Sequence, residues 1–307
     1  MATGGLGGYF GFMLARGGNN VYFVSRGKHL ETIKKHGLRL VTNEGDSTIQ
    51  AKATDNPKDV GPVDLVLFCV KTYDTLEAAK AILPILEPRS TVLTLQNGVN
   101  NYETISSIVG KERVLLGGAL VASEVKEPGV IKVSTKVRKV VIGELGGVET
   151  DRASKINQMF KKAEVDCDLT NDIEKFLWRK MLWICGMAGM NSITRLPIGD
   201  VLATKETKEM FRQVMEEVAS VARAKGVEVG QDFVKGRVEF AERELEKDST
   251  ASMMRDLLYG KRLELDALNG AIVRMGKELN VPTPMNQAID AALRPHLNGR
   301  PARVLIS

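Results

Sequence analysis

The stretch "ATGGLGGYFG", residues 2–11, decides how the first half of this 307-residue chain is interpreted. Gly4 and Gly7 keep the spacing of the last two glycines of G-x-G-x-x-G, while Ala2 stands at the first. In that motif the middle glycine lets the backbone approach a pyrophosphate, and the last lets the helix pack closely on the sheet. The N-terminus of the helix then offers free N–H groups to the phosphates. The stretch predicts a phosphate-binding turn, with a glycine-rich leader as the alternative.

Short apolar runs follow this turn at intervals that leave room for crossover helices. The predicted strands are "NVYFVS" (20–25), "VDLVLFCV" (63–70), "STVLTLQ" (90–96) and "RVLLGGALVAS" (113–123), and "DTLEAAKAILPIL" (74–86) is a predicted helix. Such alternation indicates a parallel, doubly wound sheet. The segment 129–145 is predicted to form an antiparallel hairpin that closes the sheet. No strand precedes the turn, so we expect exposed ladder groups, lower stability and weaker cofactor binding than with a first strand.

From about residue 151 the pattern changes to long stretches with apolar residues at spacings of three and four, which is typical of amphipathic helices. The longest of these cover 174–193, 208–226 and 262–280. We therefore predict an α/β, Rossmann-like dinucleotide-binding domain over 1–165 and an all-helical substrate domain over 166–307. A ligand site is expected between the two domains, because ligand pockets favour domain interfaces.

Composition and charge narrow the class of protein. Hydrophobic residues make up 43% and charged residues 26% of the chain, as in ordinary globular proteins. The net charge is +5, but the basic residues are interleaved with acidic ones along the chain, so nucleic-acid binding is not predicted. No apolar run approaches the ~20 residues of a membrane span, and no secretion signal is visible, so we expect a cytoplasmic protein. An apolar helical half would support a homodimer.

The cysteines and histidines do not suggest a metal site or a catalytic dyad. Cys69, Cys167 and Cys185 are far apart, with no C-x-x-C pair, so neither a disulfide framework nor a zinc site is predicted. Cys69 and Cys185 lie in apolar runs and are expected to be buried. The histidines are expected at the surface: His29, His36 and His296.

The end of the strand 20–25 indicates which cofactor the turn would take. A dinucleotide-binding fold places an acidic residue near this point to bind a ribose 2′-hydroxyl, whereas an arginine accommodates a 2′-phosphate. The sequence "SRGK" carries Arg26 and Lys28 and no acid. NADPH is therefore favoured over NADH, with an ordinary basic surface turn as the alternative.

Several motifs in order along the chain resemble the ketopantoate reductase family, the 2-dehydropantoate 2-reductases. They are "GGLGGYFGFMLARGGNNVYFVSRGKHLETIKKHGLRL", "DLVLFCVKTYDT", "LTLQNGVNN", "EPGVI", "FLWRKMLWICGMAGMNSITRLPIGDVL" and "SMMRDLLYGKRLELDALNG". The resemblance covers essentially the whole chain. It implies NADPH-dependent reduction of 2-dehydropantoate to pantoate, as in pantothenate biosynthesis.

The resemblance also implies roles for individual residues. Lys180 in "WRKM" is the catalytic general acid and binds the substrate, Asn97 in "LQNG" contacts cofactor and substrate, and Ser252 binds the substrate carboxylate. Lys71 and Glu264 contact the cofactor. Taken alone, Lys180 would be a surface charge, Ser252 a helix N-cap and Glu264 half of a helix charge pair. The remaining cofactor-binding residues are Gly4, Gly5, Leu6, Gly7 and Arg26, and no metal is implied.

Three positions depart from the family pattern. Ile184, Ala188 and Ile198 stand where the resemblance leads us to expect asparagines. Because lost hydrogen-bond partners shift specificity strongly, a more apolar 2-oxo acid stays open as the substrate. Asn191 or Ser192 is a candidate to compensate. A nucleotide-binding protein without turnover is a further alternative.

Overall fold

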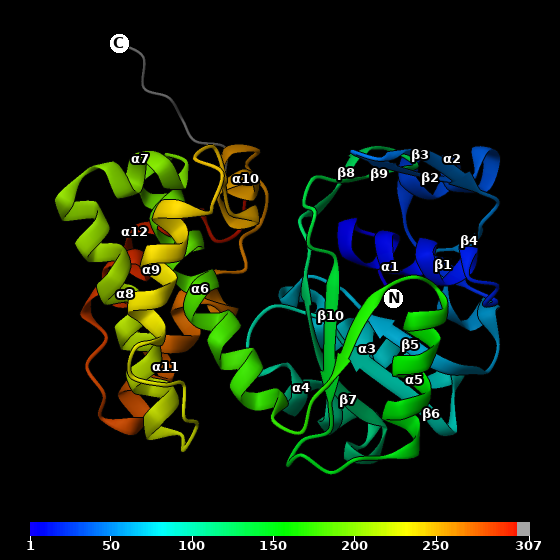
Figure 1. Ribbon diagram of the computed structural model, residues 1–307. Helices are drawn as coiled ribbons and strands as arrows, with labels where there is room; N and C mark the ends of the chain where they lie inside the picture. Colours follow the sequence, from blue (N-terminus) through cyan, green and yellow to red (C-terminus); the bar gives the residue numbers. More distant parts are fainter. Residues whose placement is uncertain (300–307) are drawn as a thin grey trace. The chain divides into compact units, whose positions relative to one another are not determined.

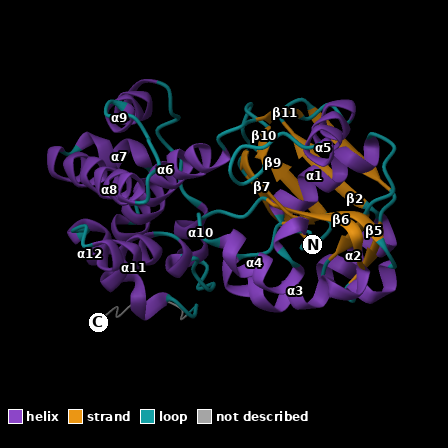
Figure 2. Cartoon of the chain, turned by 90° about the horizontal axis from the view of Figure 1, so that it is seen from below, coloured by secondary structure: helices purple, strands orange, loops and turns teal. Residues whose placement is uncertain are grey.

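The computed structural model describes residues 1–299, which belong to two compact units (Figures 1 and 2). The first unit holds almost all residues up to Ile173, and the second holds the described residues from Glu174 to 299. One short segment, Asn97–Val99, belongs to the second unit although it lies within the first half of the sequence. The division lies eight residues beyond the expected boundary at 165/166, because a strand over 166–169 joins the first unit.

The largest sheet of the first unit contains three of the four strands that the apolar runs predict, those expected over 63–70, 90–96 and 113–123. Its order is β11-β10-β7-β6-β5, in which β5, β6 and β7 run parallel and β10 runs antiparallel to β7. β11 pairs in parallel with β10, so the chain belongs to this unit at least as far as β11. The bounds are β5 Val63–Phe68, β6 Leu86–Thr94, β7 Val114–Leu120, β10 Lys139–Gly143 and β11 Asp166–Leu169.

A second sheet, of four strands, corrects the hairpin predicted over 129–145. Its order is β3-β2-β9-β8, so β9 pairs with β2 and β8, whereas β10 belongs to the five-stranded sheet. The Ile131 side chain of β9 packs against Gly8 of the first helix, where any Cβ would lie 2.6 Å from it. This packing draws β9 away from β10. The bounds are β2 Leu38–Thr42, β3 Gly45–Ile49, β8 Ser123–Glu127 and β9 Val130–Val133.

The third sheet has only two strands, β1 (Tyr22–Val24) and β4 (Lys52–Thr54), which pair in parallel. Main-chain hydrogen bonds from residues 1–3 connect it to the five-stranded sheet. The N–H of Thr3 donates to the carbonyl of Val24 over 2.9 Å, and the N–H of Cys69 donates to the carbonyl of Met1 over 3.1 Å. The first three residues therefore occupy the end of a gap between β1 and β5.

Helices pack against these sheets and form two apolar cores with them. Phe10, Phe12 and Phe160 are fully buried in the core that contains α1 and α5. Phe68 and Ile82 belong to a second core, formed where β5 and β6 pack with α3 and α4. The bounds are α1 Gly5–Arg16, α2 Gly27–His36, α3 Thr75–Ile82, α4 Asn101–Val109 and α5 Asp151–Lys162, with a short 3-10 helix η3 at Leu83–Ile85.

The second unit is helical among its described residues. Gly186 and Gly189 of its long central helix, α6, allow Phe211 and Ile289 to pack closely. A Cβ added at either glycine would lie only 2.8 Å from the side chain of Phe211 or Ile289, respectively. The helix predicted over 262–280 begins only at residue 269, because the main chain of residue 263 pairs with that of residue 297. The bounds are α6 Ile173–Thr194, α7 Ile198–Ala203, α8 Lys205–Ala224, α9 Phe233–Arg243, α10 Ser252–Leu258, α11 Asn269–Leu279 and α12 Pro284–Leu293.

An α/β first half followed by a helical second half is thus confirmed. All three cysteines are free thiols; Cys167 and Cys185 are fully buried and Cys69 is half-buried. Within residues 1–299 no helix combines the length and the apolarity that a bilayer crossing requires. No group of three or more His, Cys, Asp or Glu side chains in that range is arranged to hold a metal ion.

Candidate active site

The glycines of the N-terminal turn divide into two kinds. A Cβ at Gly5 would lie 2.4 Å from the carbonyl oxygen of Ser123, and a Cβ at Gly7 would lie 2.1 Å from that of Ala2. These two glycines are required by the chain's own packing. A Cβ at Gly4 would meet nothing within 4 Å. The surface at Gly4 is therefore open to a ligand, as the middle glycine of a phosphate-binding turn should be.

The N-terminus of α1 is suited to an anion. Gly4 is the N-cap residue, no side chain caps the helix, and its first turn contains no acidic residue. The first N–H groups of such a helix lack an intrahelical partner and carry the positive end of the helix dipole. Ala2, which replaces the first glycine of the motif, has a φ of 65°, in the left-handed region that glycine adopts readily. The predicted turn thus has an uncapped helix start and an open surface at Gly4, and its role in phosphate binding stays a prediction.

His29 supports this turn, contrary to the surface position expected for it. One ring nitrogen, Nε2, lies 2.9 Å from the carbonyl oxygen of Thr3, and Nδ1 accepts a 2.8 Å hydrogen bond from the N–H of Gly129. The two bonds together require the neutral ring with its proton on Nε2. Burial lowers the pKa of His29, against the opposing effect of its bond to Thr3. Nothing in the sequence around "GKHL" indicates this role.

Arg26 lies two residues after the end of β1 and is the exposed N-cap residue of α2. Lys28, in the first turn of the same helix, is exposed as well. The sequence predicts that a basic side chain at this point binds the ribose 2′-phosphate. The structure leaves both side chains accessible, and the role of Arg26 stays a prediction.

The carboxyl ends of β5 and β6 are held together by Gln96. Its side-chain amide donates to the carbonyl of Val70 over 2.9 Å and to the hydroxyl of Thr75 over 2.8 Å. Lys71 is half-buried in the loop thus fixed, and Asn97 follows Gln96 directly. Gln96 is a positioning residue whose partners the sequence does not reveal, although it lies within "LQNG".

Lys180 and Glu264 interact electrostatically within the helical unit. Lys180, on α6, is half-buried, and Glu264 is buried with 7% of its surface exposed. Burial lowers the pKa of Lys180 to about 8, and the carboxylate of Glu264 acts in the opposite direction. A lysine with such a pKa gives up its proton far more readily near neutral pH than a solvated lysine does. The structure thus brings together the predicted general acid and one of its predicted neighbours.

Asn97 and Ser252 also belong to the second unit. Asn97 is half-buried, and Val99 next to it packs against the helical core. Ser252 is the exposed first residue of α10, whose N-cap is Ala251, so the alternative reading of Ser252 as the N-cap is wrong. No hydrogen bond to a described residue engages the Ser252 hydroxyl, which leaves it available to a ligand.

The amide of Asn191 is already used within the protein. Its oxygen accepts from the N–H of Ala251 over 3.0 Å, and its nitrogen donates to the carbonyl of Leu196 over 2.8 Å. The side chain is fully buried, so the idea that Asn191 replaces a lost substrate contact is wrong. It instead fixes the start of α10, next to Ser252. Ser192 is also buried, with 1% exposed.

The three positions that depart from the family pattern contribute to the apolar core of the helical unit. Ala188 and Ile198 are each 1% exposed within that core, and Ile184 packs against it. Apolar side chains at these positions therefore stabilise packing. They supply no hydrogen bond to a substrate.

Two family profiles match most of the chain. The profile described as ketopantoate reductase PanE/ApbA matches residues 3–147, and the one described as ketopantoate reductase PanE/ApbA C terminal matches residues 172–296. The chain belongs to the ketopantoate reductase family. As a ketopantoate reductase family protein it is an oxidoreductase, and membership supports NAD(P)H-dependent reduction of a 2-oxo acid.

Individual relatives of this ketopantoate reductase family protein match along almost their whole length. A PanE/ApbA family ketopantoate reductase from Ralstonia eutropha is 35% identical, with 96% of each chain covered and a TM-score of 0.89. A 2-dehydropantoate 2-reductase of Archaeoglobus fulgidus is 30% identical over 94% of each chain. A D-mandelate dehydrogenase in complex with NADH and anilino(oxo)acetate is 23% identical, covers 96% of each chain and has a TM-score of 0.90. That last likeness shows a common fold.

Proposed function

We propose that this protein reduces 2-dehydropantoate to pantoate with NADPH. The observation that carries the proposal is Lys180, whose pKa burial lowers to about 8 in the neighbourhood of the Glu264 carboxylate. A 2-oxo acid reductase needs a proton donor for the forming alkoxide, and this side chain has the required chemistry. Family membership supports the same reaction class.

The cofactor would be held mainly by the first unit. The N–H groups at the start of α1 would bind the pyrophosphate, which can approach because Gly4 leaves the surface open. Arg26 would pair with the 2′-phosphate of NADPH, and Lys71, Asn97 and Glu264 would contact other parts of the cofactor. When bound, the reduced nicotinamide supplies the hydride.

Lys180 would act on the substrate oxygen. Its ammonium donates a hydrogen bond to the ketone, polarises it and transfers a proton as the alkoxide forms. Glu264 stabilises the charged form of Lys180, which keeps the donor protonated before reaction. Ser252 and Asn97 would hold the substrate carboxylate and so orient the ketone.

A second candidate substrate is a bulkier, more apolar 2-oxo acid. Ile184 favours it, because this half-buried apolar side chain stands where an asparagine is expected. Ala188 and Ile198 lie inside the apolar core and do not bear on this choice. The same lysine and the same hydride chemistry would apply to either substrate.

The test is NADPH oxidation with 2-dehydropantoate and a set of bulkier 2-oxo acids. Lys180→Ala should lower kcat by about 10²- to 10⁴-fold, the usual contribution of a general acid. Lys235→Ala, an exposed lysine of α9, serves as the control and should leave kcat unchanged. In the parent protein, kcat/KM should fall as the pH rises above about 8, because Lys180 of the free enzyme loses its proton.

Each outcome is informative. Turnover on 2-dehydropantoate that is lost in Lys180→Ala supports both the reaction and the proton donor. Turnover restricted to another 2-oxo acid keeps the mechanism and changes the substrate. A folded protein that binds NADPH but does not oxidise it with any of the 2-oxo acids tested would instead favour a nucleotide-binding role without turnover.

A further inference from the structure

Five side chains form a cluster where α6 and α9 of the second unit face each other. Arg179 and Trp183 are four residues apart and therefore share one face of α6. The other three share one face of α9, at spacings of four and three. We call these five residues the Arg–aromatic cluster: Arg179, Trp183, Phe233, Arg237 and Phe240.

Aromatic rings surround the guanidinium groups of this cluster. The Cζ atom of Arg237 lies 5.3 Å from the ring centroid of Phe233 and 5.4 Å from that of Phe240. Its distance to the ring of Trp183 is 5.7 Å. The Cζ atom of Arg179 lies 4.9 Å from the ring centroid of Phe233. The rings attract the cations and hold both planar groups in place, so a ligand would lose little affinity to side-chain ordering.

No carboxylate neutralises these two arginines within the described chain. Neither guanidinium forms a hydrogen bond or an ion pair with any of the residues 1–299. Both side chains are half-buried, and the Nε atom of each is buried without an acceptor. A buried donor without a partner costs free energy, and one in a charged group costs more. The cluster therefore contains donors that an anion from outside the chain would satisfy.

The two positive charges also affect each other. Both guanidinium groups lie against the ring of Phe233, so they are neighbours. Burial lowers the pKa of Arg237, and the charge of Arg179 lowers it further. Two unpaired like charges in a half-buried place are unfavourable. An anion with two negative charges would remove this cost.

The chemistry of the donors indicates which anion fits. A guanidinium presents a planar fork of N–H groups that matches the oxygens of carboxylate and phosphate. Because each Nε is buried, a ligand would bind the terminal Nη groups of Arg179 and Arg237. A phosphate group carries about −1.5 to −2 charges near pH 7 and has three acceptor oxygens. It thus matches the two positive charges better than a single carboxylate does.

We propose that the Arg–aromatic cluster binds a phosphate group, either as inorganic phosphate or as a small phosphate monoester. This site is separate from the proposed general acid. Lys180 follows Arg179 directly, and consecutive residues of a helix point about 100° apart. No residue of the cluster has a role in the proposed reduction, so the site goes beyond that function.

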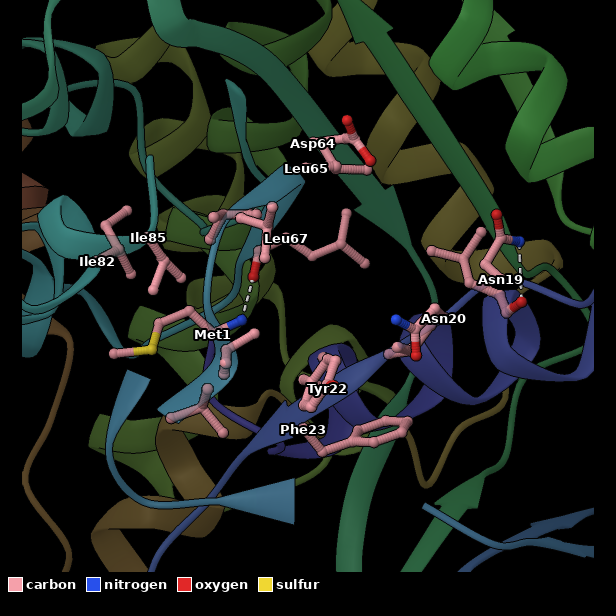
Figure 3. Close-up of a pocket in the computed structure, with 18 of the residues that line it drawn as sticks. Met1, Asn19, Asn20, Tyr22, Phe23, Asp64, Leu65, Leu67, Ile82 and Ile85 are labelled. Carbon is pink, nitrogen blue, oxygen red and sulfur yellow. Dashed lines mark hydrogen bonds between the residues drawn. The ribbon is translucent and has the colours of Figure 1, made fainter. Parts of the chain in front are cut away.

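The start of α1 is another place in this molecule that suits phosphate. The cavity of about 350 Å³ between β1 and β5 is a different case (Figure 3). Among the described residues that line it, Asp64 has the only charged side chain, which repels an anion. The Met1 amine also lines it and donates a 2.6 Å hydrogen bond to the carbonyl of Leu67. The test therefore has to distinguish the Arg–aromatic cluster from the start of α1.

The test is titration calorimetry of the full chain at pH 7.5 and constant ionic strength. Inorganic phosphate, glycerol 3-phosphate and the dicarboxylate succinate are titrated separately. The variants are Arg179→Gln, Arg237→Gln and Arg237→Lys. Arg243→Gln, at an exposed arginine in the last turn of α9, is the matched control. Unfolding temperatures in phosphate-free buffer show whether each variant is folded, and amide hydrogen exchange over 233–243 reports on α9.

The parent protein should bind at least one of the two phosphates with a Kd of about 1 mM or lower. The phosphate that binds more tightly identifies the source of the group. Arg179→Gln and Arg237→Gln should each raise this Kd at least about tenfold, because each removes charge-assisted donors. Arg237→Lys should also bind more weakly, because an ammonium cannot form the bidentate pair. Arg243→Gln should leave the Kd unchanged.

Hydrogen exchange gives a local readout of the same site. At a phosphate concentration of about ten times the Kd, exchange in α9 should slow by up to about tenfold in the parent protein. Arg179→Gln and Arg237→Gln should lose this effect. Phosphate bound at the start of α1 would not produce it.

Four results would overturn the proposal. One is the absence of binding by either phosphate. A second is a phosphate affinity that stays the same in both glutamine variants, or in Arg237→Lys if the glutamine variants do not fold. A third is an equal loss in Arg243→Gln, which would show a general effect of charge. Tighter binding of succinate than of either phosphate would assign the cluster to carboxylates instead. None of these readouts requires cofactor binding or turnover.

Discussion

His29 connects two main-chain groups that are distant in sequence, the carbonyl of Thr3, 26 residues before it, and the N–H of Gly129, 100 residues after it. Thr3 lies immediately before Gly4, so the imidazole supports the turn at the start of α1. A protonated ring cannot accept from Gly129, because both of its nitrogens then carry hydrogen. The turn should therefore be sensitive to pH through this one residue.

We predict that the free energy of unfolding decreases as the pH falls below 6.5, the ordinary pKa of histidine. Burial lowers the pKa of His29 in the folded chain, so the unfolded chain binds this proton more strongly. The contribution is fully present above pH 6.5 and is lost as the pH drops toward the lowered value.

His29→Ala should cost about 1–3 kcal/mol at pH 7.5, because it leaves buried main-chain groups unpaired, and should reduce this pH dependence. His36→Ala, at an exposed histidine at the end of α2, is the matched control. Urea unfolding between pH 5 and pH 8 measures both. An unchanged pH dependence in His29→Ala would contradict the assignment.

Single residues also show where prediction from sequence stops. The family resemblance placed Lys180, and burial next to Glu264 supports its role. The partners of His29 and Gln96 could not be predicted, because each side chain bonds to residues from other parts of the chain. Asn191 was misassigned for the same reason: its bond to Ala251 spans 60 residues.

At the scale of elements, α1 depends on glycine for two separate reasons. Gly7 lies against the carbonyl of Ala2. A Cβ added at Gly4, in contrast, would meet nothing within 4 Å, and the φ of Gly4 is −78°, which alanine adopts easily. Substituting Gly4 and Gly7 one at a time should therefore distinguish an effect on ligand binding from an effect on folding.

We expect Gly4→Ala to keep the unfolding temperature of the parent protein within about 2 °C and to weaken NADPH binding by at least about tenfold, because the added methyl group occupies the pyrophosphate approach. Gly7→Ala should instead destabilise the fold by about 1–3 kcal/mol or more, because its Cβ overlaps a main-chain oxygen. Thermal unfolding and NADPH fluorescence titration distinguish the two. Normal NADPH affinity in Gly4→Ala would argue against the cradle.

Elements with a strong apolar run were predicted well, as β5, β6, β7 and α6 show. Their pairing was not always predictable. The segment 129–145 contains two strands, but β9 packs against Gly8 and pairs with β2, which is distant in sequence. Similarly, the start of α11 was placed too early, because the chain near residue 263 pairs with residue 297.

At the scale of the whole molecule, each unit has its own apolar core. A ligand that binds the folded state stabilises it according to its concentration and affinity. If the first unit holds the cofactor, the unfolding temperature of that unit in the presence of NADPH or NADH shows which cofactor binds more tightly.

NADPH at about 100 times its Kd should stabilise the folded state by about 2.7 kcal/mol, which corresponds to a rise of about 5–10 °C in unfolding temperature. NADH at the same concentration should give a smaller rise. Arg26→Asp should reduce the NADPH effect while sparing that of NADH, because it replaces a partner of the 2′-phosphate with a repelling charge. Lys34→Asp, at an exposed position of α2, is the control. Equal losses for both cofactors would remove Arg26 from this role.

The link made by Gln96 has a thermodynamic consequence. This buried amide ties the loop that carries Lys71 to the strand end that continues into Asn97. A ligand that orders the first loop therefore lowers the entropy cost of ordering the second. This coupling is reciprocal, so if Lys71 contacts the cofactor and Asn97 the substrate, each ligand should raise the affinity for the other by the same factor.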